Sequence, residues 1–186
     1  MRLFVAVNFP PILRQEVWEA LQPLREANYP VRWVDVDQIH VTVKFLGNVD
    51  DERVDAIGQA VRDAAAGTRR FALPLGGAGA FPNAKRPRVV WIGCEAVPAL
   101  ELLQHTMERR MERFGFPLEG RPFRPHVTLG RVKRDAPPRD FRSLEADLAA
   151  IDFATVSDVS SVDLMESRLG KDGARHVCRV EGALAD

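Results

Sequence analysis

The stretch HVTV at residues 40–43 returns as HVTL at residues 126–129, and this repeat decides how the rest of the chain is interpreted. Both copies are rich in Val and Thr, which is typical of a β-strand. Side chains two residues apart in a strand point to the same face, so His40 and Thr42 share one face while Val41 lies on the other. Two such strands could hold one phosphate between two imidazoles and two hydroxyls.

Each copy of the repeat closes a similar run of predicted elements. An apolar strand at residues 3–7 and a helical stretch at 11–25 precede the first copy, and a strand at 89–93 and a helical stretch at 98–114 precede the second. The copies lie about half the chain apart, so one duplication is indicated and not a solenoid of short repeats. We predict an α+β fold in which two intertwined lobes, related by a pseudo-twofold axis, form one domain over residues 1–186.

Composition narrows the possible partners. The 186 residues are 46% hydrophobic and 28% charged, which describes an ordinary globular protein able to bury a sizeable core. The 26 basic and 26 acidic residues balance, so we do not predict a wide basic surface that binds a long polyanion. A local basic cluster within one groove is still compatible with this composition. No apolar run approaches the length that spans a bilayer, so we expect no membrane partner.

Two cysteines, Cys94 and Cys178, each lie in an apolar strand-like run. They form no C-x-x-C pair, and we predict buried free thiols, as in a protein of the reducing cytoplasm. Only five apolar residues separate Arg2 from Asn8, too few for the core of a signal peptide, and a cytoplasmic location is therefore expected.

Four further segments have a predicted structure. The glycine-rich residues 76–79 match no phosphate-binding motif and favour a flexible strand end or a bulge. The basic residues 85–88 suit either a solvated hairpin loop or a contact to an RNA backbone. Residues 141–151 predict an amphipathic helix, and residues 169–173 predict the turn of a hairpin between two final strands.

The two repeats carry the residue types that phosphodiester hydrolysis requires. Histidine gives or takes a proton near neutral pH, and two imidazoles on opposite sides of a phosphorus atom can serve as general acid and general base. The hydroxyls of Thr42 and Thr128 are suited to bind the non-bridging oxygens. The pattern lacks the carboxylates and cysteines of a usual metal site, so His40 and His126 predict acid–base chemistry without a metal.

Strict alternation assigns the neighbouring side chains to faces. It places Lys44 beside the first histidine and threonine, where its ammonium could meet a substrate phosphate, and it places Arg124 on the face of His126. Arg131 points the other way unless a bulge turns it. Phe45 is assigned to the buried face.

The other two histidines are predicted to lie outside the chemistry. His105 falls on a helix among polar residues and is expected at the surface. His176 shares a strand face with Cys178, and a structural role is favoured over a place in the wall of the groove.

Together these segments resemble a known family. The two HxTx motifs in a duplicated α+β chain are similar to those of the two-histidine (2H) phosphoesterases. The wider context resembles the bacterial and archaeal RNA 2′,3′-cyclic phosphodiesterases, also called 2′-5′ RNA ligases, from Arg2 to about Val180. The segments that carry the resemblance are MRLFVAVNFP (1–10), Trp33-Val34 leading to HVTVKFLG (40–47), FPNAKRPRVVWIG (81–93) and FRPHVTLGR (123–131).

The resemblance implies both a fold and an activity. It implies two lobes, each a small antiparallel sheet with outer helices, and a central groove lined by both motifs. The implied reaction is hydrolysis of an RNA 2′,3′-cyclic phosphate to a 2′-phosphomonoester without metal or cofactor, with reversible 2′-5′ joining of RNA ends. His40 corresponds to the proton donor, His126 to the proton acceptor and Arg131 to a substrate-binding arginine. His176 stands where the family often has tyrosine.

The expected partner is therefore RNA with a 2′,3′-cyclic phosphate end, such as a tRNA fragment, bound by a monomer. A rival from another class is a non-catalytic module that binds RNA or a nucleotide in the same groove. Both histidines are present, and a binding module does not need them, so the sequence favours the enzyme.

Overall fold

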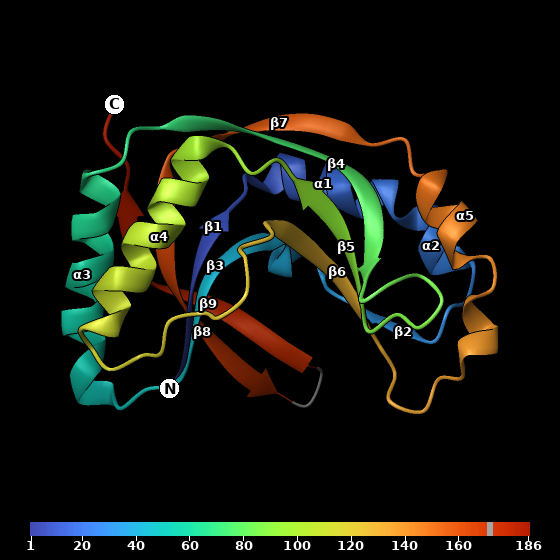
Figure 1. The fold of residues 1–186 in the computed structure, drawn as a ribbon, viewed down its shortest axis with the longest axis horizontal. Helices are drawn as coiled ribbons and strands as arrows, with labels where there is room; N and C mark the ends of the chain where they lie inside the picture. The colour runs from blue at the N-terminus through green and yellow to red at the C-terminus, as the bar shows by residue number, and fades with distance from the viewer. Residues whose placement is uncertain (171–172) are drawn as a thin grey trace.

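The computed structural model describes residues 1–170 and 173–186 and contains a strongly curved antiparallel sheet (Figure 1). The strand order is β7-β4-β5-β6-β3-β1-β8-β9, and β2 pairs with β6 beside this path. The sheet arches over the face that opens downward in Figure 1. The site described below lies on that concave face.

One half of the sheet is built from both ends of the chain. Helix α3 packs on β8, β9 and α4, and α4 also packs on β3, so this pair of helices covers the convex side of the half. The elements of this terminal half are β1 (Arg2–Asn8), β3 (His40–Asn48), β8 (Ser161–Gly170), β9 (Gly173–Ala183), α3 (Val54–Ala66) and α4 (Pro98–Glu112).

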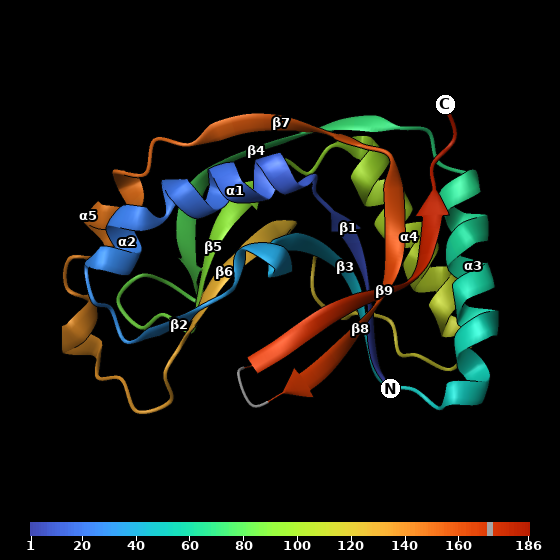
Figure 2. The ribbon, with the colours of Figure 1, turned by 180° about the vertical axis from the view of Figure 1, so that it is seen from behind.

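The other half is built from the middle of the chain. Helix α5 packs on β4 and α2 packs on α5, while Figure 2 shows α1 lying in the same half. The elements of this central half are β2 (Val31–Trp33), β4 (Phe71–Phe81), β5 (Val89–Cys94), β6 (His126–Val132), β7 (Ala154–Val159), α1 (Pro11–Ala20), α2 (Gln22–Glu26) and α5 (Leu144–Ala149). Three short 3₁₀ helices complete the chain: η1 (Val36–Gln38), η2 (Asp51–Arg53) and η3 (Pro138–Phe141).

In the described part of the chain, the strands of the two halves pair at one position. Strands β3 and β6 are antiparallel, and their one paired position is Val41 opposite Val127. Both valines are fully buried. The prediction of an α+β fold with two antiparallel halves is confirmed, and this pair joins the halves into one sheet.

Burial follows the alternation of the central strands. Val5 and Val7 of β1 point into the main core, where Leu100, Leu103 and Met107 of α4 are also buried. Full burial of a side chain of this size stabilises the fold by about 1.5–3 kcal/mol. The opposite face of β1 belongs to a separate small cluster on the concave side, formed by Phe4, Ala6 and Met165.

Several predicted segments take the form expected of them. The glycine-rich segment continues strand β4 and contains a bulge at Gly77, whose φ of 68° suits glycine. The helix predicted over 141–151 is shorter than expected, since η3 ends at Phe141 and α5 covers only Leu144–Ala149. Strands β8 and β9 pair as predicted, whereas part of the turn predicted at 169–173 lies outside the described residues. Within the described ranges, no helix is both long and apolar enough to span a membrane.

Candidate active site

The pairing of Val41 with Val127 brings the two repeats together. Because both valines point into the core, the residues on either side of them point to the concave face. Those four residues are His40, Thr42, His126 and Thr128, all of which are half-buried. The structure therefore brings both imidazoles and both hydroxyls onto one face, as the repeat predicts.

Each imidazole is held in the same way. The Nδ1 atom of His40 lies 2.6 Å from the carbonyl oxygen of Gln38, and Nδ1 of His126 lies 2.7 Å from the carbonyl oxygen of Arg124. A carbonyl only accepts hydrogen bonds, so each Nδ1 carries a proton and donates it. The Nε2 atom of each ring is left to exchange protons, and in His40 it lies 3.2 Å from Oγ1 of Thr42.

Aromatic rings pack around His40. The ring of Phe4 lies 5.0 Å from the imidazole, centroid to centroid, and the ring of His176 lies 5.1 Å from it. The pKa of His40 is lowered to about 4, chiefly by burial; the nearby His176, His126 and Arg131 act in the same direction, and the Gln38 carbonyl opposes the change. Burial also lowers the pKa of His176. With the groove empty, His40 is therefore neutral at neutral pH.

His126 has a corresponding aromatic neighbour. The ring of Phe81 meets the imidazole edge-on at 5.0 Å and lies 5.1 Å from Trp91. The indole of Trp91 lies directly over Gly79, where an added Cβ would come within 2.3 Å of the ring. Burial is the main cause that lowers the pKa of His126, and the charge of Arg131 acts in the same direction.

A bulge in β6 turns Arg131 toward the site. Trp91 lies opposite Thr128, but the next residue of β5, Val90, lies opposite Gly130, so Leu129 is the extra residue. Leu129 and Gly130 are both buried, and Arg131 returns to the face of Thr128. Arg32 of β2 lies opposite Arg131, so two exposed guanidinium groups extend this side of the site.

A matching bulge in β3 overturns the prediction for Lys44. Thr42 lies opposite Ala6 and Lys44 opposite Val5, so Val43 is the extra residue and Lys44 turns to the core side. The side chain of Lys44 is buried; its Nζ lies 2.7 Å from Oε2 of Glu108 and donates to the carbonyl of Pro117 at 2.6 Å. The expectation that it meets a substrate phosphate is wrong because alternation breaks at the bulge.

The same bulge overturns the prediction that Phe45 is buried. Phe45 lies opposite Phe4, whose ring is 6.4 Å away, on the concave face. It is 65% exposed. Counted from each histidine, Phe45 holds the position in β3 that Arg131 holds in β6, so one end of the site is aromatic and the other is cationic.

Of the other residues discussed from the sequence, some lie where they are predicted and others do not. His105 is exposed, as predicted. Cys178, on the edge strand β9, is exposed and the prediction that it is buried is wrong, while Cys94 is half-buried. Arg124 is exposed and supplies the carbonyl that orients His126. His176, for which a structural role is predicted, lies beside His40. The sequence shows only that His176 shares a strand face with Cys178, and this pattern does not indicate a position next to a motif histidine.

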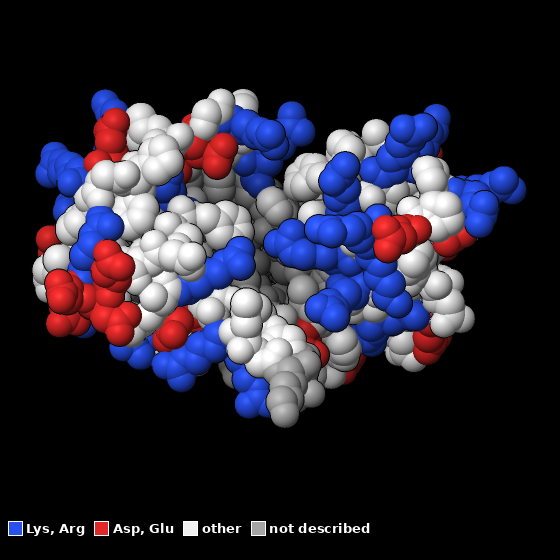
Figure 3. Space-filling model, turned by 90° about the horizontal axis from the view of Figure 1, so that it is seen from below, with Lys and Arg blue, Asp and Glu red and all other residues white. Residues whose placement is uncertain are grey.

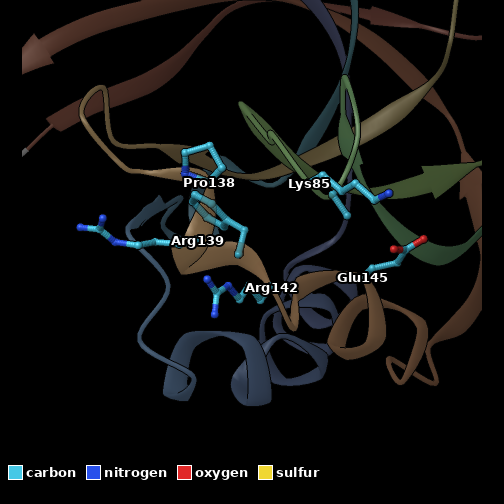
Figure 4. A pocket seen from close by; sticks show the side chains of 7 residues that line it. Lys85, Pro138, Arg139, Arg142 and Glu145 are labelled. Carbon is cyan, nitrogen blue, oxygen red and sulfur yellow. The ribbon is translucent and has the colours of Figure 1, made fainter.

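The concave face is hollowed between the two halves, and Lys and Arg side chains gather on the edge that belongs to the central half (Figure 3). A separate hollow of about 480 Å³ lies between the β4–β5 loop and η3. Its lining includes Lys85, Arg139, Phe141 and Arg142, but neither motif histidine (Figure 4). This hollow is therefore separate from the candidate site on β3 and β6.

Within residues 1–170 and 173–186, no group of three or more His, Cys, Asp or Glu side chains is arranged to hold a metal ion. The expectation of a metal-free reaction rests on the acid–base chemistry of the imidazoles themselves.

Comparison with known proteins identifies the family of this chain. The family model of the 2′-5′ RNA ligase superfamily matches residues 13–171. An RNA 2′,3′-cyclic phosphodiesterase of Methanothermobacter thermautotrophicus is 33% identical over 93% of this chain and 93% of its own length. The enzyme of the same name from Escherichia coli is 35% identical over 75% of this chain and 78% of its own.

Solved structures give the same result. A protein of Thermus thermophilus superposes with a TM-score of 0.83 at 26% identity, covering 99% of this chain and 98% of the other. LigT of Escherichia coli in complex with 3′-AMP superposes with a TM-score of 0.75 at 26% identity, covering 100% of this chain and 98% of the other. The resemblance carried by the two HxTx motifs is thereby confirmed, and the chain belongs to the 2′-5′ RNA ligase superfamily.

Proposed function

We propose that this chain hydrolyses the 2′,3′-cyclic phosphodiester at the end of an RNA to a 2′-phosphomonoester. The observation that carries the proposal is the pair of imidazoles on one face, each with Nδ1 donating to a carbonyl and Nε2 available for proton transfer. The curated relatives bear the name of this activity, which supports the same reaction.

In the proposed mechanism, Nε2 of His126 takes a proton from a water molecule as the water oxygen attacks phosphorus. The bond between phosphorus and O3′ breaks, and protonated Nε2 of His40 gives its proton to the departing O3′. The products are a free 3′-hydroxyl and a 2′-phosphomonoester, with one proton moved from His40 to the RNA and one from water to His126. A positioned acid or base of this kind contributes about 10²–10⁴-fold to the rate.

The negative charge that builds on the phosphoryl oxygens has three proposed partners. The hydroxyls of Thr42 and Thr128 flank the imidazoles on the same face and would donate to the non-bridging oxygens. Arg131, turned to that face by the β6 bulge, would add a full positive charge. Arg124 would contact RNA farther from the phosphorus. Lys44 is not part of this proposal.

The low pKa of His40 makes substrate binding part of the mechanism. A general acid must be protonated, and burial keeps His40 neutral while the groove is empty. A phosphodiester anion beside the ring stabilises the imidazolium and raises its pKa. We therefore propose that His40 takes up a proton as RNA binds.

The aromatic end of the site would hold the terminal nucleoside. Phe45 is exposed next to Phe4, and Phe4 packs on His40, so a flat apolar surface adjoins the proposed proton donor. Stacking of a base on such a surface is worth about 1–3 kcal/mol. With an RNA 5′-hydroxyl in the place of water, the same opening of the cyclic phosphate at O3′ would join two ends, such as those of a tRNA fragment, by a 2′-5′ bond.

Residues 1–186 are proposed to act as one domain and as a monomer, because β3 and β6 of the same chain supply both motifs. A cytoplasmic location is proposed because Cys94 and Cys178 are free thiols, which suits a reducing compartment.

The test is incubation with an oligoribonucleotide that ends in a 2′,3′-cyclic phosphate, in EDTA, followed by mapping of the product. We expect a 2′-phosphate, and we expect His40→Ala to reduce kcat by about 10²-fold or more. Activity lost in EDTA and restored by a divalent ion would contradict the mechanism. Tight binding without turnover would favour the non-catalytic alternative.

The two histidine roles can be separated with a nitrophenyl phosphodiester. Its leaving group departs without protonation, so loss of the general acid should cost little on this substrate. His40→Ala should be partly rescued and His126→Ala should not. Rescue of His126→Ala alone would reverse the assignment of donor and acceptor.

A further inference from the structure

The central half carries a strip of cations that the reaction itself does not use. Arg32 lies opposite Arg131 in the β2–β6 pairing, and Val132 donates its N–H to the carbonyl of Arg88 at 2.9 Å. The N–H of Lys133 donates to Pro30 just before β2. Arg32, Arg88 and Lys133 thus lie on three neighbouring backbone segments, and we call these three residues the basic rim.

The basic rim is exposed and lacks acidic partners. All three side chains are exposed, and in the described part of the chain none has a carboxylate within 4.0 Å. Some arginines of the terminal half are paired: Arg109 with Glu112 at 2.9 Å and Arg110 with Asp63 at 3.8 Å. Unpaired cations repel one another, so a cluster of them suits an anionic ligand better than it suits folding.

The basic rim is continuous with the proposed active site. Arg131 lies on the concave face of β6 with His126 and Thr128, and Arg32 extends the same row onto β2. Figure 3 shows blue side chains running from the hollow outward over this half, while the other half shows red and blue intermixed. A chain of phosphates that leaves the groove at Arg131 therefore meets cations next.

A second cationic feature lies beyond the basic rim. The 480 Å³ hollow has Lys85 of the β4–β5 loop on one side and Arg142 and Glu145 on the other (Figure 4). The β4–β5 loop ends at Arg88, so the hollow and the basic rim belong to one surface. This extends the positive surface away from the histidines.

We propose that the single-stranded RNA leading to the cyclic end lies across the basic rim, with its phosphates on Arg32, Arg88 and Lys133. This inference rests on the proposed function, because it takes the reacting phosphate to be held between the two histidines. The basic rim contacts no base, and it adds affinity for RNA chains over cyclic mononucleotides. The preferred substrate class is therefore an oligoribonucleotide.

The size of the effect follows from counterion release. Each phosphate contact to a single strand changes the slope of log K against log salt by about −0.7, so three contacts give a slope of about −2. Between about 50 mM and about 200 mM salt, these contacts would cost about 20-fold in RNA affinity.

The test compares two substrates, a 2′,3′-cyclic mononucleotide and an oligoribonucleotide of about eight nucleotides with the same end. The quantity measured is the ratio of kcat/KM on the oligonucleotide to kcat/KM on the mononucleotide, at both salt concentrations. The test variant removes the three charges of the basic rim: Arg32→Gln, Arg88→Gln and Lys133→Gln. The control variant removes three exposed arginines that likewise have no carboxylate within 4.0 Å in the described ranges: Arg62→Gln, Arg69→Gln and Arg113→Gln.

We expect the wild type to prefer the oligonucleotide, and we expect the test variant to lower that preference by at least about tenfold and flatten its salt dependence. The control variant should keep both. If the wild type and the test variant prefer the oligonucleotide equally, the basic rim does not bind RNA and the inference is overturned. The inference is also overturned if the wild type does not distinguish the two substrates. Lack of turnover on either substrate would instead refute the proposed function. Loss of oligonucleotide preference in the control variant would show a general charge effect and would also overturn the inference.

Discussion

The depressed pKa of His40 predicts a specific loss of stability in acid. Burial holds the pKa of His40 near 4 in the folded protein, below the ordinary 6.5. As pH falls through the window between 6.5 and 4, the unfolded chain binds a proton that the folded chain does not, so folding is destabilised. At about pH 4.5 the two values give a loss of about 2–3 kcal/mol from this one residue.

Replacement of His40 by glutamine removes the titration while keeping a polar side chain at this site. We expect urea unfolding to show that the wild type loses about 2–3 kcal/mol more than His40→Gln when the pH is lowered from about 7 to about 4.5. The carboxylates and the other histidines titrate in both proteins and cancel in the comparison. Equal acid-induced losses in the two proteins would refute the reasoning.

The pKa of His40 should rise when phosphate binds. In the empty protein, an NMR titration of His40 should give a pKa near 4, and inorganic phosphate should raise that pKa because an anion stabilises the imidazolium. The profile of kcat/KM should then be a bell on the acid side of neutrality, reporting macroscopic values for the pair of histidines. A His40 that titrates near 6.5 without phosphate would contradict the structure of the site.

Three further predictions concern single positions. His126→Ala should lower kcat by about 10²–10⁴-fold, whereas His105→Ala, exposed on α4, should have little effect in the same assay. Lys44→Met should cost about 3–5 kcal/mol of stability in urea unfolding, because it leaves the buried carboxylate of Glu108 without its cation. Adding Glu108→Gln should recover much of that cost. Phe45→Ala should leave stability within about 0.5 kcal/mol of the wild type, since Phe45 is exposed, while it weakens RNA binding by about 1–3 kcal/mol.

The elements of the fold were largely predictable from the sequence, because hydrophobic periodicity is a local property. The valines of the two repeats alternate with the polar residues, and both valines at the centre are fully buried as alternation requires. The union of the halves into one sheet was not predictable. It depends on the contact between Val41 and Val127, which are far apart in the chain, and nothing local to either strand specifies that pair.

Within the site, alternation identified the faces correctly up to each threonine and failed directly after it. The bulges at Val43 and Leu129 shift the register by one residue, so Lys44 turns to the core and Arg131 turns to the groove. Only Gly130 gave a local hint of this kind, since glycine in a strand often marks a bulge or a close approach. An added Cβ there would lie 2.5 Å from Val31.

These two bulges also explain how a duplicated chain comes to have a directional site. The motif residues occupy equivalent places about the Val41–Val127 pair, and in each strand the bulge presents the fifth residue after the histidine to the groove. That residue is Phe45 in one half and Arg131 in the other. In the proposed mechanism both halves face the same phosphorus, which accounts for the repeat of histidine, valine and threonine. The proposed RNA end offers a base in one direction and a chain of phosphates in another, which accounts for the difference at the position after the bulge.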